Sequence, residues 1–77
     1  MTAEALAGLR PAQAAVQVRL ALEEAGCPDA AYDAGLLCRL ATGRDPRLDE
    51  RPLTEAIAQK LAGDTARRCR RYPLQYL

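Results

Sequence analysis

Apolar residues recur at helical spacing along most of the chain. In residues 12–25 they fall three or four positions apart, at Ala15, Val18, Leu22 and Ala25, and the stripe is widened by Val16 and Leu20. Pro11 stands before this stretch and Gly26 after it, which are typical residues at a helix start and a helix end. We therefore predict a helix over residues 12–25, a short helical turn within residues 1–10, and a break near Pro11.

A second helix is predicted from Pro28 to about Ala41, with Asp29 near its positive end and Gly43 stopping it. Its apolar side consists of Ala30, Ala34, Leu37 and Ala41, flanked by Leu36 and Leu40. Gly35 lies in the middle of this helix, where glycine costs about 1 kcal/mol relative to alanine. That cost predicts a close helix crossing at Gly35.

The last predicted helix covers residues 53–71. Leu53, Ile57, Leu61 and Cys69 lie along one face. It must end near Arg71 or Tyr72, because Pro73 disfavours the α conformation in the residue before it. Residues 44–52 are charged and contain two prolines, so we expect a connector with one short helical turn around Leu48.

These elements predict an all-α fold, a small bundle of about four to five helices that run mainly antiparallel. A chain of 77 residues without Phe or Trp can build only a small core, so we expect one domain of modest stability. We assign residues 1–72 to this helical domain. Residues 73–77 are apolar except for Gln75 and are expected to begin a linker to a further domain beyond Leu77.

Composition excludes several kinds of chemistry. The sequence has no His, Ser or Asn, which removes Ser-His and Cys-His catalysis and histidine metal sites. We therefore predict no catalytic, cofactor-binding or metal residues here. The three cysteines, Cys27, Cys38 and Cys69, are odd in number and widely spaced, as expected for buried thiols in a reducing, cytoplasmic setting. The sequence contains neither a membrane-span pattern nor a signal-peptide pattern.

Charge is concentrated at the end of the last helix, at Arg67, Arg68, Arg70 and Arg71. Helical geometry puts Arg67, Arg70 and Arg71 on one side and Arg68 off it. The cluster is either a solvated helix end or a surface for a following domain or an acidic partner. Nucleic-acid binding is disfavoured because the net charge is only +1. The candidate contact residues are Arg67, Arg70, Arg71, Tyr72, Leu74 and Tyr76.

Asp33 lies at the edge of the apolar face of its helix. It is either a solvated carboxylate or a structural ion-pair partner, since an unpaired carboxylate would be costly to bury. We hypothesise that it pairs with Arg67, Arg70 or Arg71 and so fixes the direction in which the chain leaves the bundle.

Two blocks carry a family resemblance. Residues 71–77, RYPLQYL, resemble the junction segment of the HemK/PrmC-type methyltransferases, in which an arginine precedes Pro-x-x-Tyr and an aliphatic residue. Residues 26–43, GCPDAAYDAGLLCRLATG, resemble that family's earlier helix, with Asp33-Ala34 as its Asp-Ala pair.

The resemblance implies the N-terminal helical domain of an enzyme that modifies the glutamine of the Gly-Gly-Gln motif in peptide chain release factors. The family's Asn-Pro-Pro-Tyr cannot occur in a chain without asparagine, so these residues would be non-catalytic. The parent enzyme would use S-adenosylmethionine. The implied partners are a release factor and a C-terminal methyltransferase domain of the same protein. The alternative is a free-standing helical adaptor or nucleic-acid-associated module without enzymatic activity.

Overall fold

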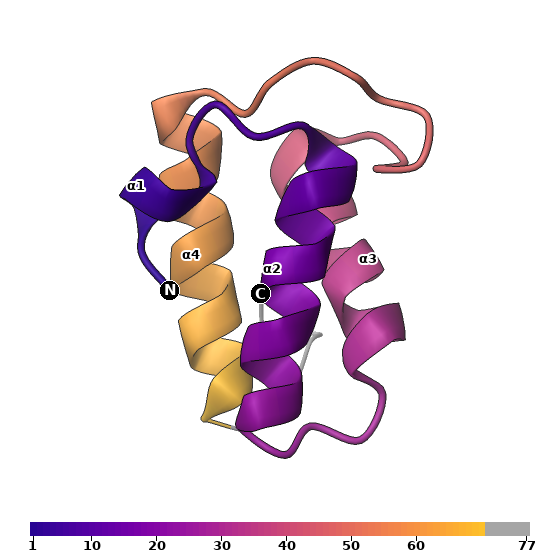
Figure 1. Ribbon diagram of the computed structural model, residues 1–77, viewed down its shortest axis with the longest axis vertical. Helices are drawn as coiled ribbons and strands as arrows, with labels where there is room; N and C mark the ends of the chain where they lie inside the picture. The colour runs from indigo at the N-terminus through magenta and orange to yellow at the C-terminus, as the bar shows by residue number, and fades with distance from the viewer. Residues whose placement is uncertain (71–77) are drawn as a thin grey trace.

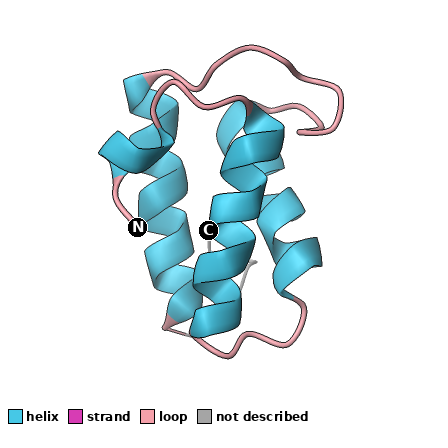
Figure 2. Cartoon of the chain, in the orientation of Figure 1, coloured by secondary structure: helices cyan, strands magenta, loops and turns pink. Residues whose placement is uncertain are grey.

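The computed structural model describes residues 1–70, which form four helices (Figure 1). They are α1 (Ala3–Leu6), α2 (Pro11–Glu24), α3 (Ala30–Thr42) and α4 (Glu55–Cys69). Helices and loops account for all of residues 1–70, with no strand among them (Figure 2). The prediction of a small all-α bundle is confirmed.

The three long helices alternate in direction. α2 and α3 run antiparallel beside each other, and α4 runs antiparallel to α3 (Figure 1). The core lies between them, and each of the four helices contributes at least one fully buried aliphatic side chain: Leu6, Val18, Leu22, Leu37 and Leu61. Buried alanines on the same faces allow the helices to approach closely, among them Ala14, Ala34 and Ala58.

Backbone hydrogen bonds join the two connections at one end of the bundle. The Gly8 N–H donates to the Leu53 carbonyl at 2.9 Å, and the Leu53 N–H donates to the Leu9 carbonyl at 2.8 Å. Gly8 has a φ of 83°, a left-handed conformation that glycine adopts without steric cost. The segment before α2 and the segment before α4 are thereby held side by side.

Helix boundaries follow the local capping residues. α2 begins at Pro11, the predicted break. α3 begins at Ala30, because Pro28 lies in a turn and Asp29 is the N-cap. α4 begins at Glu55, after Thr54 accepts the Ile57 N–H at 3.2 Å through its Oγ1. Both helices therefore start two residues later than predicted.

One feature of the predicted apolar face of α2 is wrong. Val16 and Leu20 were expected to widen the core stripe of α2, yet they are 44% and 48% exposed. The buried face runs instead through Pro11, Ala14, Val18 and Leu22, three or four residues apart. The single helical turn predicted around Leu48 is present: the Leu48 and Asp49 N–H groups donate to the Asp45 carbonyl at 3.0 and 3.1 Å, and the Leu48 side chain is exposed.

The close helix crossing predicted at Gly35 is absent. A Cβ added at this position would meet nothing within 4 Å, so no neighbouring helix requires a glycine here. The space above Gly35 is open.

Gly35→Ala should therefore raise the free energy of unfolding by about 1 kcal/mol, because it removes only the helical penalty of glycine. Gly43→Ala should lower it by about 1 kcal/mol, since Gly43 ends α3 with a φ of 76°. Urea denaturation of both variants measures the two effects. A loss of stability in Gly35→Ala would contradict this description of the site.

Candidate functional site

A buried ion pair joins the start of α3 to the end of α4. The Arg68 Nε donates to the Asp33 Oδ2 at 2.9 Å, and the two side chains are 20% and 4% exposed. The antiparallel arrangement of α3 and α4 brings these positions together although 35 residues separate them. A charge-assisted bond of this geometry satisfies a carboxylate that would otherwise be costly to bury.

The pair corrects the predicted partner of Asp33. Arg67, Arg70 or Arg71 was expected, and the structure places Arg68 there. Arg68 lies seven residues after Leu61 and three after Thr65, so it continues the buried stripe of α4 toward α3. Of the other arginines, Arg67 and Arg70 are exposed and lie off this stripe.

A second buried carboxylate, Asp64, lies on α4 and was not singled out by the sequence analysis. Its Oδ2 accepts a hydrogen bond from the Lys60 Nζ at 2.8 Å, and the Arg67 Nη1 lies 3.7 Å from its Oδ1. The signal in the sequence was the spacing of four and three residues between these charges. Arg67 is thus oriented along its own helix.

The remaining predicted contact residues are placed only in part. Arg70 caps α4 and is exposed. Arg71, Tyr72, Leu74 and Tyr76 lie outside the described residues. The contact role of this set stays a prediction.

The connector between α3 and α4 contains two similar turns. Asp45 accepts hydrogen bonds from Arg47, among them one from the backbone N–H at 2.9 Å and one from the guanidinium Nη2 at 2.9 Å. The Arg39 Nη2 lies 3.4 Å from the Asp45 Oδ2. Asp49 accepts the Arg51 N–H at 3.1 Å and the Arg51 Nε at 3.2 Å. In both turns, an aspartate is followed two residues later by the arginine that it binds.

The first turn carries a strong electrostatic perturbation. The hydrogen bond from the Arg47 side chain, supported by the Arg47 N–H and by the charges of Arg47 and Arg39, lowers the pKa of Asp45 to about 2. Asp45 raises the pKa of Arg47 in return. The cluster thus keeps its charges over the whole neutral range.

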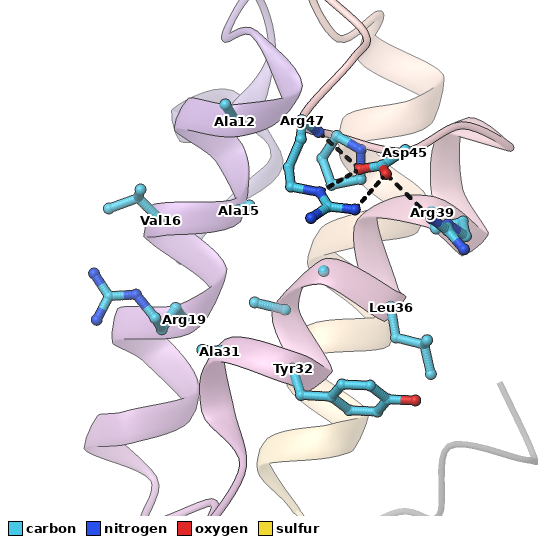
Figure 3. Close-up of a pocket in the computed structure, with 13 residues that line it drawn as sticks. Ala12, Ala15, Val16, Arg19, Ala31, Tyr32, Leu36, Arg39, Asp45 and Arg47 are labelled. Carbon is cyan, nitrogen blue, oxygen red and sulfur yellow. Dashed lines mark hydrogen bonds and ion pairs between the residues drawn. The ribbon is translucent and has the colours of Figure 1, made fainter.

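A groove of about 590 Å³ lies between α2 and α3 (Figure 3). Alanines and Gly35 line it, with Val16 and Arg19 on the α2 side and Tyr32 and Leu36 on the α3 side. Arg39, Asp45 and Arg47 close one end (Figure 3). This groove was not predicted from the sequence, and the signals that could have indicated it were the broad apolar stripe of α2 and the mid-helix glycine.

The thiols are arranged as structural groups. Cys27 and Cys38 are buried and Cys69 is partly buried. Burial raises the pKa of the Cys38 thiol to about 11, so it stays protonated. The Cys27 Sγ lies 3.8 Å from the Arg68 carbonyl, and the Cys69 Sγ lies 3.8 Å from the Ala21 carbonyl.

Residues 1–70 contain no group of three or more Cys, Asp or Glu side chains that could hold a metal ion. Within the same range, the helices lack the length and apolar character needed to cross a bilayer.

Residues 1–70 thus form a small all-α bundle with ion-paired carboxylates and a groove between α2 and α3. The family model of the PrmC N-terminal domain matches residues 13–77. The chain therefore belongs to the PrmC N-terminal domain family, the family that the two sequence blocks indicated. No curated protein and no solved structure matched the chain.

Arg68→Ala should lower the free energy of unfolding by roughly 3 kcal/mol, because it leaves the Asp33 carboxylate buried without its partner. A double-mutant cycle with Asp33→Ala should give a coupling energy of about 1 kcal/mol or more. The matched cycle with Arg67→Ala should give a coupling near zero, since Arg67 lies beside Asp64. Equal coupling in both cycles would contradict the assignment.

The Asp45 carboxyl should titrate near pH 2, and Arg47→Gln should move its midpoint up toward the ordinary value of 3.8. A folded-state pKa below the ordinary value means that the stabilising contribution is present above about pH 4 and is lost as the pH falls through about 2. Carboxyl-detected NMR titration measures the midpoint. Arg51→Gln, the control in the second turn, should leave the Asp45 midpoint unchanged.

Proposed function

We propose that this chain is the non-catalytic docking domain of an S-adenosylmethionine-dependent protein glutamine methyltransferase that acts on the Gly-Gly-Gln motif of peptide chain release factors. The observation that carries the proposal is the match of the PrmC N-terminal domain over residues 13–77. In this proposal the cofactor and the reacting groups belong to a methyltransferase domain that follows.

A docking domain of this kind contributes binding energy away from the reacting atoms. Contacts with a distant part of a macromolecular substrate reduce the freedom that must be lost when the target side chain enters the active site. Such a domain needs a defined surface and a fixed connection to its neighbour. The groove between α2 and α3 offers such a surface, and the Asp33–Arg68 pair near the end of α4 supports such a connection.

The arrangement of the terminal arginines favours this proposal over the nucleic-acid-associated module. Arg68 binds the buried Asp33, and Arg67 lies 3.7 Å from the buried Asp64. Two guanidinium groups are therefore held against carboxylates of the bundle, which reduces the basic surface that could follow a phosphate backbone.

A competition experiment tests the proposal. The 77-residue chain, added in excess to a PrmC-type methyltransferase, should inhibit methylation of a folded release factor, because both would bind the same surface of the substrate. It should leave methylation of a short Gly-Gly-Gln peptide unchanged, since such a peptide lacks the remote surface. Radiolabelled methyl transfer measures both rates.

Two results would contradict the proposal. One is unchanged methylation of the folded release factor at saturating chain. The other is equal inhibition of both substrates, which would indicate an effect on the catalytic domain or on the cofactor. As a control, calorimetry of the chain with S-adenosylmethionine should detect no binding.

A further inference from the structure

We infer that the groove between α2 and α3 is the surface that takes up the protein substrate, and that the docked segment is acidic and carries an apolar side chain. This inference rests on the proposed function and deepens it by naming the surface and the chemistry of the partner. Three observations carry it: the open centre of the groove, the apolar side chains on its sides, and the excess of positive charge around it.

The centre of the groove is open and apolar. Ala15 from α2 and Ala34 and Gly35 from α3 line it, and a Cβ built on Gly35 meets nothing within 4 Å. The volume of about 590 Å³ falls within the roughly 300–1,000 Å³ typical of binding clefts. An incoming side chain can therefore contact the backbone of α3 at Gly35 without displacing part of the bundle.

Apolar side chains border this centre on both helices. Val16 on α2 is 44% exposed, and Tyr32 on α3 is 69% exposed (Figure 3). In Figure 3 the Val16 side chain extends away from α3 and the Tyr32 ring extends away from α2, so the two form apolar outer margins on opposite sides of the groove. Covering them with an apolar group of a partner would remove that area from water.

The charged residues that line the groove are three arginines and one aspartate, a net charge of +2. Asp45 lies between two of the arginines, bound to Arg47 at 2.9 Å and near Arg39 at 3.4 Å. One carboxylate faces two guanidinium groups, which leaves an excess of positive charge at this end. The third arginine that lines the groove, Arg19, pairs with Glu23 on its own helix at 3.2 Å. Carboxylates of a partner would be attracted to this end of the groove.

Other occupants fit these observations less well. A symmetric contact with a second copy would bring together two grooves that each carry a net positive charge. Nucleic acid presents a phosphate about every 1.7 Å of helix axis and needs an extended row of basic groups. This groove instead combines an apolar centre with a local charge excess.

α4 ends at the opposite end of the bundle from the Arg39–Asp45–Arg47 cluster (Figure 1), so the cluster lies away from Arg70.

The experiment titrates a purified release factor into the isotopically labelled 77-residue chain and follows the backbone amides by NMR. Gly35→Leu fills the open centre and should weaken the dissociation constant about tenfold. Gly63→Leu is the matched control, because Gly63 also lies in mid-helix with nothing within 4 Å of an added Cβ, but on α4 away from the groove. Both changes replace glycine with a good helix former, so both variants should fold.

A second pair of variants tests the charge. Arg47→Glu should weaken binding about tenfold, and the loss should shrink at high salt. Arg51→Glu is the control for this variant, because Arg51 makes the same kind of turn with Asp49 but does not line the groove. The affinity of the Arg51→Glu chain for the release factor should stay within about twofold of that of the unaltered chain. Circular dichroism of all four variants checks that the bundle is retained.

The outcomes separate the two proposals. If the unaltered chain binds and the groove variants match their controls, the groove inference is overturned and the proposed function stands. If the unaltered chain does not bind, the proposed function fails and the inference falls with it. If sedimentation shows a dimer that Gly35→Leu dissociates, or if an RNA oligonucleotide shifts the groove amides, the inference is overturned in favour of that occupant.

Discussion

The structure depends on a very small hydrophobic core. Without Phe or Trp, the helices are held by a few aliphatic side chains, Leu6, Val18, Leu22, Leu37 and Leu61, all fully buried. Alanines beside them let the backbones approach, so the core is thin and the helices lie close together. A core of this size must be complete, because removing one large side chain costs about 2–5 kcal/mol in a domain of modest stability. Function is therefore expected at positions outside it.

The polar groups of the bundle follow from the same constraint. Asp33 and Asp64 are buried near the end of the bundle where α4 stops, where the aliphatic core gives way to long charged side chains. Within residues 1–70, no buried side-chain nitrogen or oxygen lacks a hydrogen-bond partner. The methylene stems of Arg68 and Lys60 allow the charges to reach these carboxylates while the helices stay in contact. Ion pairs thus complete the packing at an end that aliphatic residues do not fill.

Most of the fold could be predicted from sequence because its signals are local. Pro11, Gly26 and Gly43 act through backbone conformation and mark the ends of α2 and α3 within two residues or fewer. The prediction of the arginine that pairs with Asp33 was wrong because packing between the helices determines which side of α4 faces α3. The groove was missed for the same reason: whether Val16 is covered depends on the distance from α2 to its neighbour, which periodicity does not contain.

The hydrogen bonds of Leu53 with Gly8 and Leu9 have a consequence for how such a domain can diversify. They fix Leu53, two residues before α4, against the segment before α2, while α3 fixes the other end of the connector. Both ends of the connector are therefore fixed by the bundle. Each doubling of the length of such a loop lowers the free energy of unfolding by only about 0.6 kcal/mol through the entropy of loop closure. Insertions between Gly43 and Leu53 would leave the helices in place and move the position of Arg47. Related domains could change their preferred partner through loop length alone, with the bundle unaltered.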